Sequence, residues 1–195
     1  MGKYIDSGAA LSPCGRYRYL LWREWRGTHD PQHWRWLDRR DGFGEPKACV
    51  FIMLNPSTAD AEHDDPTIRR CVAFAQAWNF ERLEVVNLFA HRATDPAALL
   101  ALNDADNPVG PENHDYIENA VTQAGLVVCA WGAHGTHLGQ DETVLGWCDG
   151  VPVHCLGITK GGHPRHPLYL PRDAKPTRFR PTVSENSENG RASLE

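Results

Sequence analysis

Residues 48–54 read ACVFIML, a continuous apolar run that is followed at once by Asn55 and Pro56. Three more largely apolar runs follow along the chain, at 83–88 (LEVVNL), 126–130 (LVVCA) and 151–155 (VPVHC). Runs of this length and composition are typical of parallel strands that are covered on both faces. We therefore predict a short parallel sheet of about four strands.

Segments with helical periodicity separate these runs. Asp65 and Pro66 supply an N-cap and a first-turn proline, and apolar residues then recur at helical spacing. Similar starts stand at 95–96 (DP) and 111–112 (PE), whereas 134–147 is a weaker helix prediction because it contains glycines at 135 and 139. Strands that alternate with helices predict an α/β protein, here a three-layer α/β/α sandwich.

The segment before the first apolar run is rich in aromatic residues. Residues 17–25 (YRYLLWREW) and 33–38 (HWRWLD) partly alternate and are separated by a turn-forming stretch, which predicts a β-hairpin over 17–38. Its tryptophans either pack the hairpin on the sheet or form a platform on which bases stack. We expect one α/β domain over 1–183, with its parallel core at 47–172, and a disordered polar tail at 184–195.

Length and composition exclude several classes of protein. With 195 residues, 41% hydrophobic and 23% charged, the chain fits one globular domain and neither a disordered chain nor a fibre. It has no apolar run of about 18 residues, so we expect no membrane-spanning helix. The N-terminus lacks the apolar region of a signal peptide, which predicts a cytoplasmic protein whose six cysteines remain thiols. The absence of a Cys-x-x-Cys pair argues against a metal or iron–sulfur site, and we expect no cofactor.

The charge is unevenly distributed. The net charge is −5, yet between Lys160 and Arg180 six basic residues stand against the single acidic residue Asp173. A polyanionic partner is expected at this end of the chain, and a solvated basic loop without a partner is the alternative.

Polar residues follow every predicted strand. Ligands of open α/β sheets bind at the carboxyl ends of the strands, so these residues are the candidates for a site. They are Asn55, Pro56, Ser57 and Thr58 after the first strand, Asn87, His91 and Arg92 around the end of the second, Trp131 and Gly132 after the third, and Lys160, Arg165 and His166 after the fourth. Each one alone is also compatible with ordinary turn chemistry.

The order of these motifs resembles two families. LNPST at 54–58, VVNLFAHRATDP at 85–96, LVVCAWG at 126–132 and HPLYL at 166–170 resemble short motifs of the uracil-DNA glycosylase superfamily. Over about residues 17–172 the chain is more closely similar to a bacterial and phage family known as domain of unknown function 1643. That likeness is carried by its MLNPSTAD, DDPTIRRC, NLFAHRATDP, PVGPEN and HPLYL segments.

The glycosylase resemblance implies a uracil-DNA-glycosylase-like fold and a role for three of the candidates. Asn55 would position the attacking water, Asn87 would read the base, and His166 would stabilise the departing base anion. From their place after the predicted strands, and not from the resemblance, we expect ligand contacts from Pro56, Ser57, Thr58, His91, Arg92, Trp131 and Gly132 and phosphate contacts from Lys160 and Arg165. The cysteine ligands of cluster-containing members are absent, so the resemblance implies no cofactor.

Three functions remain open at this point. The first is a nucleobase-recognising, glycosylase-like protein that hydrolyses an N-glycosidic bond in single-stranded or locally opened DNA, or in a nucleotide. The second is a non-catalytic nucleotide or nucleic-acid binding module. The third is a metal-dependent hydrolase that uses the acidic loop 60–65 (DAEHDD), which is otherwise expected to be a solvated loop.

Overall fold

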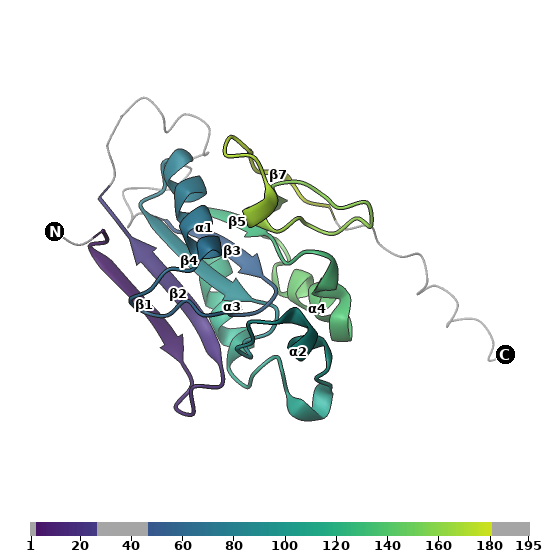
Figure 1. Ribbon diagram of the computed structural model, residues 1–195. Coiled ribbons are helices and arrows are strands. Elements are labelled where there is room, and N and C mark those ends of the chain that lie inside the picture. Colours follow the sequence, from purple (N-terminus) through teal and green to yellow (C-terminus); the bar gives the residue numbers. More distant parts are fainter. Residues whose placement is uncertain (1–2, 27–46, 181–195) are drawn as a thin grey trace.

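The computed structural model describes residues 3–26 and 47–180, and its centre is one mixed β-sheet (Figure 1). The sheet has seven strands in the order β1-β2-β4-β3-β5-β6-β7. The strands are β1 (Asp6–Leu11), β2 (Arg18–Glu24), β3 (Cys49–Met53), β4 (Arg82–Asn87), β5 (Leu126–Cys129), β6 (Val153–Cys155) and β7 (Thr177–Arg178).

The middle of the sheet is parallel and its edges are antiparallel. Strands β4, β3, β5 and β6 form the parallel part and correspond to the four apolar runs. The predicted size of about four strands is nevertheless wrong, because β1 and β2 extend one edge and β7 extends the other. Strand β1 (DSGAAL) lacks an apolar run, and β7 has only two residues, so neither carries a sequence signal for a strand.

The N-terminal hairpin differs from the predicted one. Strand β2 pairs antiparallel with β1 through a turn in which the Ser12 N–H donates to Tyr17 O at 3.0 Å. Gly15 adopts the left-handed conformation that this turn requires (φ +70°). The segment 33–38, which was predicted to be the partner of 17–25, lies outside the described residues, as does the expected tail at 184–195.

The predicted helices are confirmed together with two of their caps. The Asp65 side chain accepts from the Ile68 N–H at the start of α1 (Pro66–Ala77), and Asp95 accepts from the Ala97 N–H at the start of α2 (Pro96–Leu100). The remaining helices are α3 (Asn113–Gln123) and α4 (Gln140–Trp147), and α4 directly follows a 3₁₀ segment at Ala133–Gly139. None of the helices in 3–26 and 47–180 is long and apolar enough to cross a membrane.

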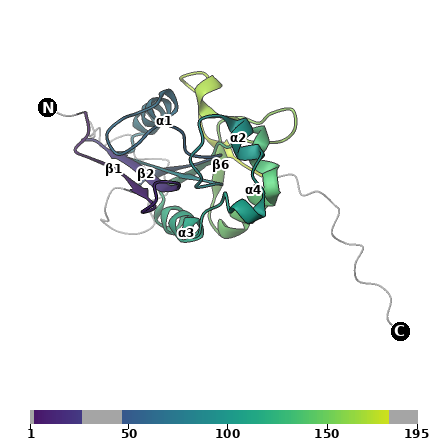
Figure 2. The ribbon, with the colours of Figure 1, turned by 60° about the horizontal axis from the view of Figure 1, so that its bottom comes forward.

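Helices cover both faces of the sheet, with α1 on one side and α3 on the other (Figure 2). Under α1, Ile68 and Cys71 pack with Phe51 and Val85. On the opposite face, helices α2, α3 and α4 pack against the side chains that point the other way from the same strands. The sheet is therefore the middle layer of three, and its two faces have separate apolar cores.

A β-bulge in β2 decides which of its side chains face α1. Leu20 pairs with Ala10, whereas Leu11 pairs with Arg18, so Tyr19 has no partner of its own in β1. A bulge of this kind re-aims the neighbouring side chains. Tyr19 stacks on Tyr116 of α3 with ring centroids 5.0 Å apart, while Arg18 reaches Ala59, which packs in the core under α1.

Candidate functional site

The loops that follow the parallel strands are tied together in pairs. The Ala93 N–H, after β4, donates to Pro56 O, after β3, at 3.0 Å. The Gly132 N–H, after β5, donates to Pro164 O, after β6, at 2.8 Å. The carboxyl edge of the sheet therefore carries two joined loop pairs, and the candidate residues are distributed between them.

Asn55 is anchored by its amide nitrogen. Its Nδ2 donates to Ala93 O at 2.7 Å and to Pro56 O at 3.1 Å. Both bonds are made by the nitrogen, and the side-chain oxygen accepts no hydrogen bond from the described residues. The side chain is half-buried, so it can present that oxygen to a small molecule where the loops after β3 and β4 meet.

Asn87 is the last residue of β4 and is buried, with 1% of its surface exposed. Leu83 and Val85, which precede it at alternate positions, belong to the core under α1, so the Asn87 side chain points to the same side. Neither its Nδ2 nor its Oδ1 has a hydrogen-bond partner among the described residues. Its backbone oxygen, by contrast, accepts from Asn113 Nδ2 at 2.9 Å.

Arg18 joins the site although the sequence did not single it out. It begins β2, which runs antiparallel to β4, so it lies at the Asn87 end of the sheet, and its N–H donates to Ala90 O at 2.9 Å. The side chain is buried with 2% of its surface exposed, its Nη1 donates to Ala59 O at 2.6 Å, and its Nε has no partner within the described ranges. Burial lowers the pKa of Arg18 to about 10, and Asp65 opposes that effect.

The sequence did hold a signal for Arg18. It is a cation within the aromatic, partly alternating run YRYLLW, where a core-facing position is not expected to carry charge. Without the bulge, simple alternation does not place it on the α1 face.

Two further candidates of the second strand lie beside Arg18. Arg92 donates from Nη1 to Gly15 O at 3.3 Å, and its buried Nε lacks a partner in the described part of the chain. His91 packs edge-on against Tyr17 with ring centroids 6.1 Å apart. Burial lowers the pKa of His91 and Arg16 adds to that effect, so its ring favours the neutral form.

The remaining candidates after the first and third strands differ in their burial and in the face of the sheet on which they lie. Pro56 is buried, Ser57 is half-buried and Thr58 is exposed. The Trp131 ring packs in the core on the α3 face and meets Phe179 edge-on, with ring centroids 6.1 Å apart. Because Asn87 points to the α1 face, the structure does not bring the Trp131 ring and the Asn87 amide together. Gly132 has a left-handed backbone conformation (φ +77°), and its N–H joins the loops after β5 and β6.

His166 is held in one orientation near the start of α1. Its Nδ1 accepts from the Leu168 N–H at 3.3 Å, which leaves the proton on Nε2. Burial lowers the pKa of His166 and the charge of Asp65 opposes this, so the ring is neutral near pH 7.

The two predicted phosphate ligands are exposed. Lys160 lies in a turn in which the Gly162 N–H donates to Thr159 O at 3.0 Å, and the Arg165 N–H donates to Gly157 O at 2.9 Å. Nearby, Tyr169 exposes 75% of its surface and Leu168 exposes 38%. This segment combines cations with apolar side chains that contact solvent.

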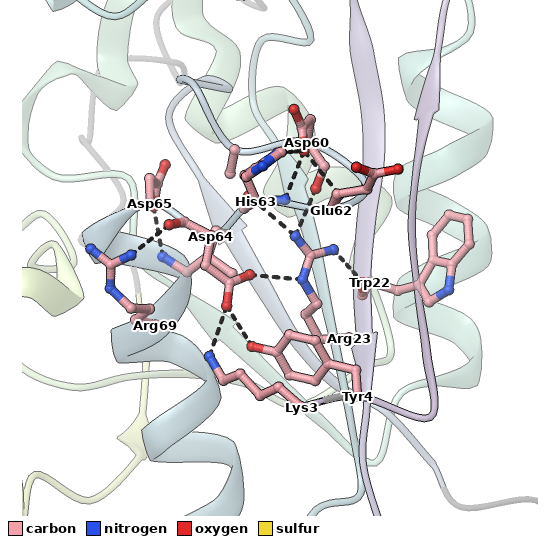
Figure 3. A network of polar contacts seen from close by, with 12 residues as sticks. Lys3, Tyr4, Trp22, Arg23, Asp60, Glu62, His63, Asp64, Asp65 and Arg69 are labelled. Atoms are coloured by element: carbon pink, nitrogen blue, oxygen red, sulfur yellow. Dashed lines mark hydrogen bonds and ion pairs between the residues drawn. The ribbon is translucent and has the colours of Figure 1, made fainter. Parts of the chain in front are cut away.

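The acidic loop is occupied by contacts within the protein (Figure 3). Asp64 accepts from Arg23 at 2.8 Å, from Tyr4 at 2.5 Å and from Lys3 at 2.8 Å, so this part of the loop is not the solvated loop expected from its sequence. Asp60 accepts from the backbone N–H groups of Glu62 and His63. In the part of the chain that is described, no group of three or more His, Cys, Asp or Glu residues is arranged to hold a metal ion.

Comparison with known proteins identifies a family. The family described as "Protein of unknown function (DUF1643)" matches residues 18–168 of the 195-residue chain. This match confirms the closer of the two resemblances. No protein with a curated description and no solved structure matches the chain.

Proposed function

The chain belongs to the DUF1643 family, whose function is unknown, and we propose that it recognises a nucleobase through Asn87 and acts as a DNA-glycosylase-like enzyme. The substrate is a base in single-stranded or locally opened DNA, or the base of a nucleotide. The reaction is hydrolysis of the bond between the base and C1′ of the sugar.

The observation that carries this proposal is the unpaired amide of Asn87. A buried polar atom without a hydrogen bond costs about 1–3 kcal/mol, and Asn87 has two atoms that bond to none of the described residues. Its amide offers one donor side and one acceptor side, and the edge of a nucleobase carries the same two groups next to each other. A base bound in this place would satisfy both atoms at once.

Asn55 and His166 supply what the cleavage step requires. Glycosidic cleavage passes through an oxocarbenium-like state, so a water needs orientation more than it needs a strong base. The free Oδ1 of Asn55 accepts a hydrogen bond from that water, whose oxygen bonds to C1′ as the C1′–N bond breaks. The electron pair leaves on the base, and the Nε2–H of neutral His166 donates to the charge that develops there. The water's proton passes to solvent or to the released base.

The basic segment suits a nucleic acid whose strand is already open. Lys160 and Arg165 are exposed cations, and the exposed Tyr169 ring offers a surface on which a base can stack. A net charge of −5 disfavours a long contact with duplex DNA. A flipped or single-stranded base costs less to capture than a paired one.

Cleavage of defined oligonucleotides tests the proposal. Each fluorescent oligonucleotide, single- or double-stranded, carries one uracil, hypoxanthine, xanthine or mismatched thymine, and alkali then converts abasic sites into strand breaks. We expect a break for at least one base and a loss of about 100-fold in rate for Asn55→Ala and for His166→Ala. His114→Ala, on α3 across the sheet, serves as the matched control and retains the wild-type rate.

A folded protein that breaks none of these strands overturns the cleavage proposal. Binding of nucleotides that is lost in Asn87→Leu, without any cleavage, then identifies a non-catalytic binding module. A metal-dependent hydrolase is less well supported, because the carboxylate of Asp64 is bonded to Arg23, Tyr4 and Lys3.

A further inference from the structure

We infer that Arg18 and Arg92 form a phosphate-binding site next to Asn87, so that the ligand is a nucleoside phosphate and not an uncharged base. The identity of the base end rests on the proposed function. The phosphate end rests on the two arginines alone and can be tested separately.

Arg18 is a buried cation that no carboxylate contacts among the described residues. Its guanidinium makes one hydrogen bond, from Nη1 to Ala59 O, and no ion pair with any described residue. Its Nε is buried and unbonded within 3–26 and 47–180, while only 2% of the residue's surface is exposed. A guanidinium taken out of water in this way is stable only if an anion compensates it.

Two other arginines of the same sheet show what a compensated guanidinium looks like here. Arg23, on the same strand, is fully buried and donates to the Asp64 carboxylate at 2.8 Å (Figure 3). Arg82 is paired with Glu24 at 3.0 Å and with Glu84 at 2.8 Å. The fold thus places carboxylates in direct contact with Arg23 and Arg82, whereas Asp65 and Asp60 act on Arg18 through their charge without an ion pair among the described residues.

Arg92 adds a second cation to the same place. The backbone N–H of Arg92 donates to Arg16 O at 3.0 Å, so the segment after β4 runs beside the start of β2. The positive charge of Arg92 contributes to the lowered pKa of Arg18, as repulsion between neighbouring cations does. The buried Nε of Arg92 also lacks a partner among the described residues. The two cations are thus near enough for their charges to interact, and each has an unused Nε–H among the described residues, which suits one multivalent anion.

The chemistry of the pair selects phosphate. A guanidinium offers parallel N–H donors that match two oxygens of a phosphate, and two guanidiniums together match its double negative charge. The backbone N–H of Arg18 donates to Ala90 O, in the segment that follows Asn87 at the end of β4. A ligand that meets both groups therefore has a base at one end and a phosphate at the other, which describes a nucleotide.

Titration calorimetry with inorganic phosphate tests the anion site, using the wild type, Arg18→Met, Arg92→Gln and Lys47→Gln. Lys47 is exposed just before β3, at the amino end of the parallel strands, so its variant makes the same change in charge away from the site. We expect the wild type and Lys47→Gln to bind phosphate equally, and Arg18→Met and Arg92→Gln to bind it at least ten-fold more weakly. Without ligand, Arg18→Met should melt at the wild-type temperature or higher, because it removes an uncompensated buried charge.

Several results overturn the anion site. One is a wild type that does not bind phosphate, and another is an equal loss in Arg18→Met and Lys47→Gln, which indicates general surface charge. A third is a lower melting temperature for Arg18→Met with unchanged phosphate binding. That result would mean that Arg18 only stabilises the loop that contains Ala59, through its hydrogen bond to Ala59 O. If Arg18→Met does not fold, Arg92→Gln decides the question.

A second titration separates this inference from the proposed function. It compares 2′-deoxynucleoside 5′-monophosphates, including deoxyuridine monophosphate, with their nucleosides and with a short single-stranded oligonucleotide. A monophosphate that binds more tightly than both its nucleoside and inorganic phosphate supports the combined site, and tighter binding of the oligonucleotide assigns the phosphate to a DNA strand. If phosphate binds and no nucleotide binds more tightly, base recognition is wrong and the anion site stands. If Arg18→Met cleaves oligonucleotides at the wild-type rate, the glycosylase activity stands and the anion site is wrong.

Discussion

Two buried asparagines that contact each other should respond in opposite ways to the same substitution. The two polar atoms of the Asn87 amide have no partner in the described part of the chain, whereas Asn113 Nδ2 donates to Asn87 O at 2.9 Å and to Leu88 O at 3.2 Å. Leucine is close in size to asparagine and has no polar atom. Asn87→Leu therefore removes two unsatisfied groups, and Asn113→Leu creates two unsatisfied carbonyls.

The magnitudes follow from the cost of an unpaired buried group, about 1–3 kcal/mol each. Relief of two such groups at Asn87 is partly offset by imperfect packing of leucine, which costs about 1–3 kcal/mol. We expect Asn87→Leu to raise the free energy of unfolding by about 1–2 kcal/mol. Asn113 also has an unpaired Oδ1, whose removal moderates the loss, so Asn113→Leu should lower the free energy of unfolding by about 1–3 kcal/mol.

Urea denaturation followed by tryptophan fluorescence and by circular dichroism measures both changes, provided that the two probes give coincident transitions. Asn87→Leu should at the same time lose nucleotide binding, since stability is commonly sacrificed at binding sites. A loss of more than 1 kcal/mol in Asn87→Leu would refute the reasoning, because it would mean that the Asn87 amide stabilises the unliganded protein.

Three further predictions concern other parts of the molecule. Asp64→Asn leaves a buried guanidinium without its anion and should cost about 3 kcal/mol at pH 7 by urea denaturation. Burial alone raises the pKa of Asp64, but the hydrogen bonds from Lys3, Tyr4 and Arg23 outweigh burial and lower that pKa. The stability that Asp64 contributes is therefore lost as the pH falls below about 4, and the difference in free energy of unfolding between wild type and variant should disappear there. The imidazole of His166 should titrate by NMR with a midpoint below 6.5, the value of a free imidazole, and should carry its proton on Nε2 at pH 7. Its contribution to stability is complete above pH 6.5 and declines below it, and a midpoint above 6.5 contradicts the assignment. Gly135→Ala places a methyl carbon 2.1 Å from an indole carbon and should cost about 1–3 kcal/mol, whereas Gly146→Ala, in helix α4 with open space around it, should stabilise the protein by about 0.5–1 kcal/mol; equal effects would exclude the steric explanation.

Local chemistry accounts for what could be predicted of the fold. Asp65 and Asp95 cap helices because a carboxylate before a proline satisfies the first N–H groups of the helix, whatever lies elsewhere in the chain. The run at 48–54 contains a central strand because an all-apolar run must be buried on both faces. The edge strands β1 and β7 could not be predicted, because their pairing depends on partners distant in sequence rather than on their own composition.

The candidate site, too, was predictable from the sequence in part only. The sequence by itself determined that polar residues such as Asn55 and Asn87 follow the strands, and parallel topology then brings strand ends to one edge. Only the tertiary structure decided that the Trp131 ring and the Asn87 amide lie on opposite faces, because the direction of a side chain depends on its position in the alternation of its own strand. Only the structure made Arg18 part of this edge, because the bulge in β2 changes that alternation and the cation acquires neighbours that no local pattern encodes.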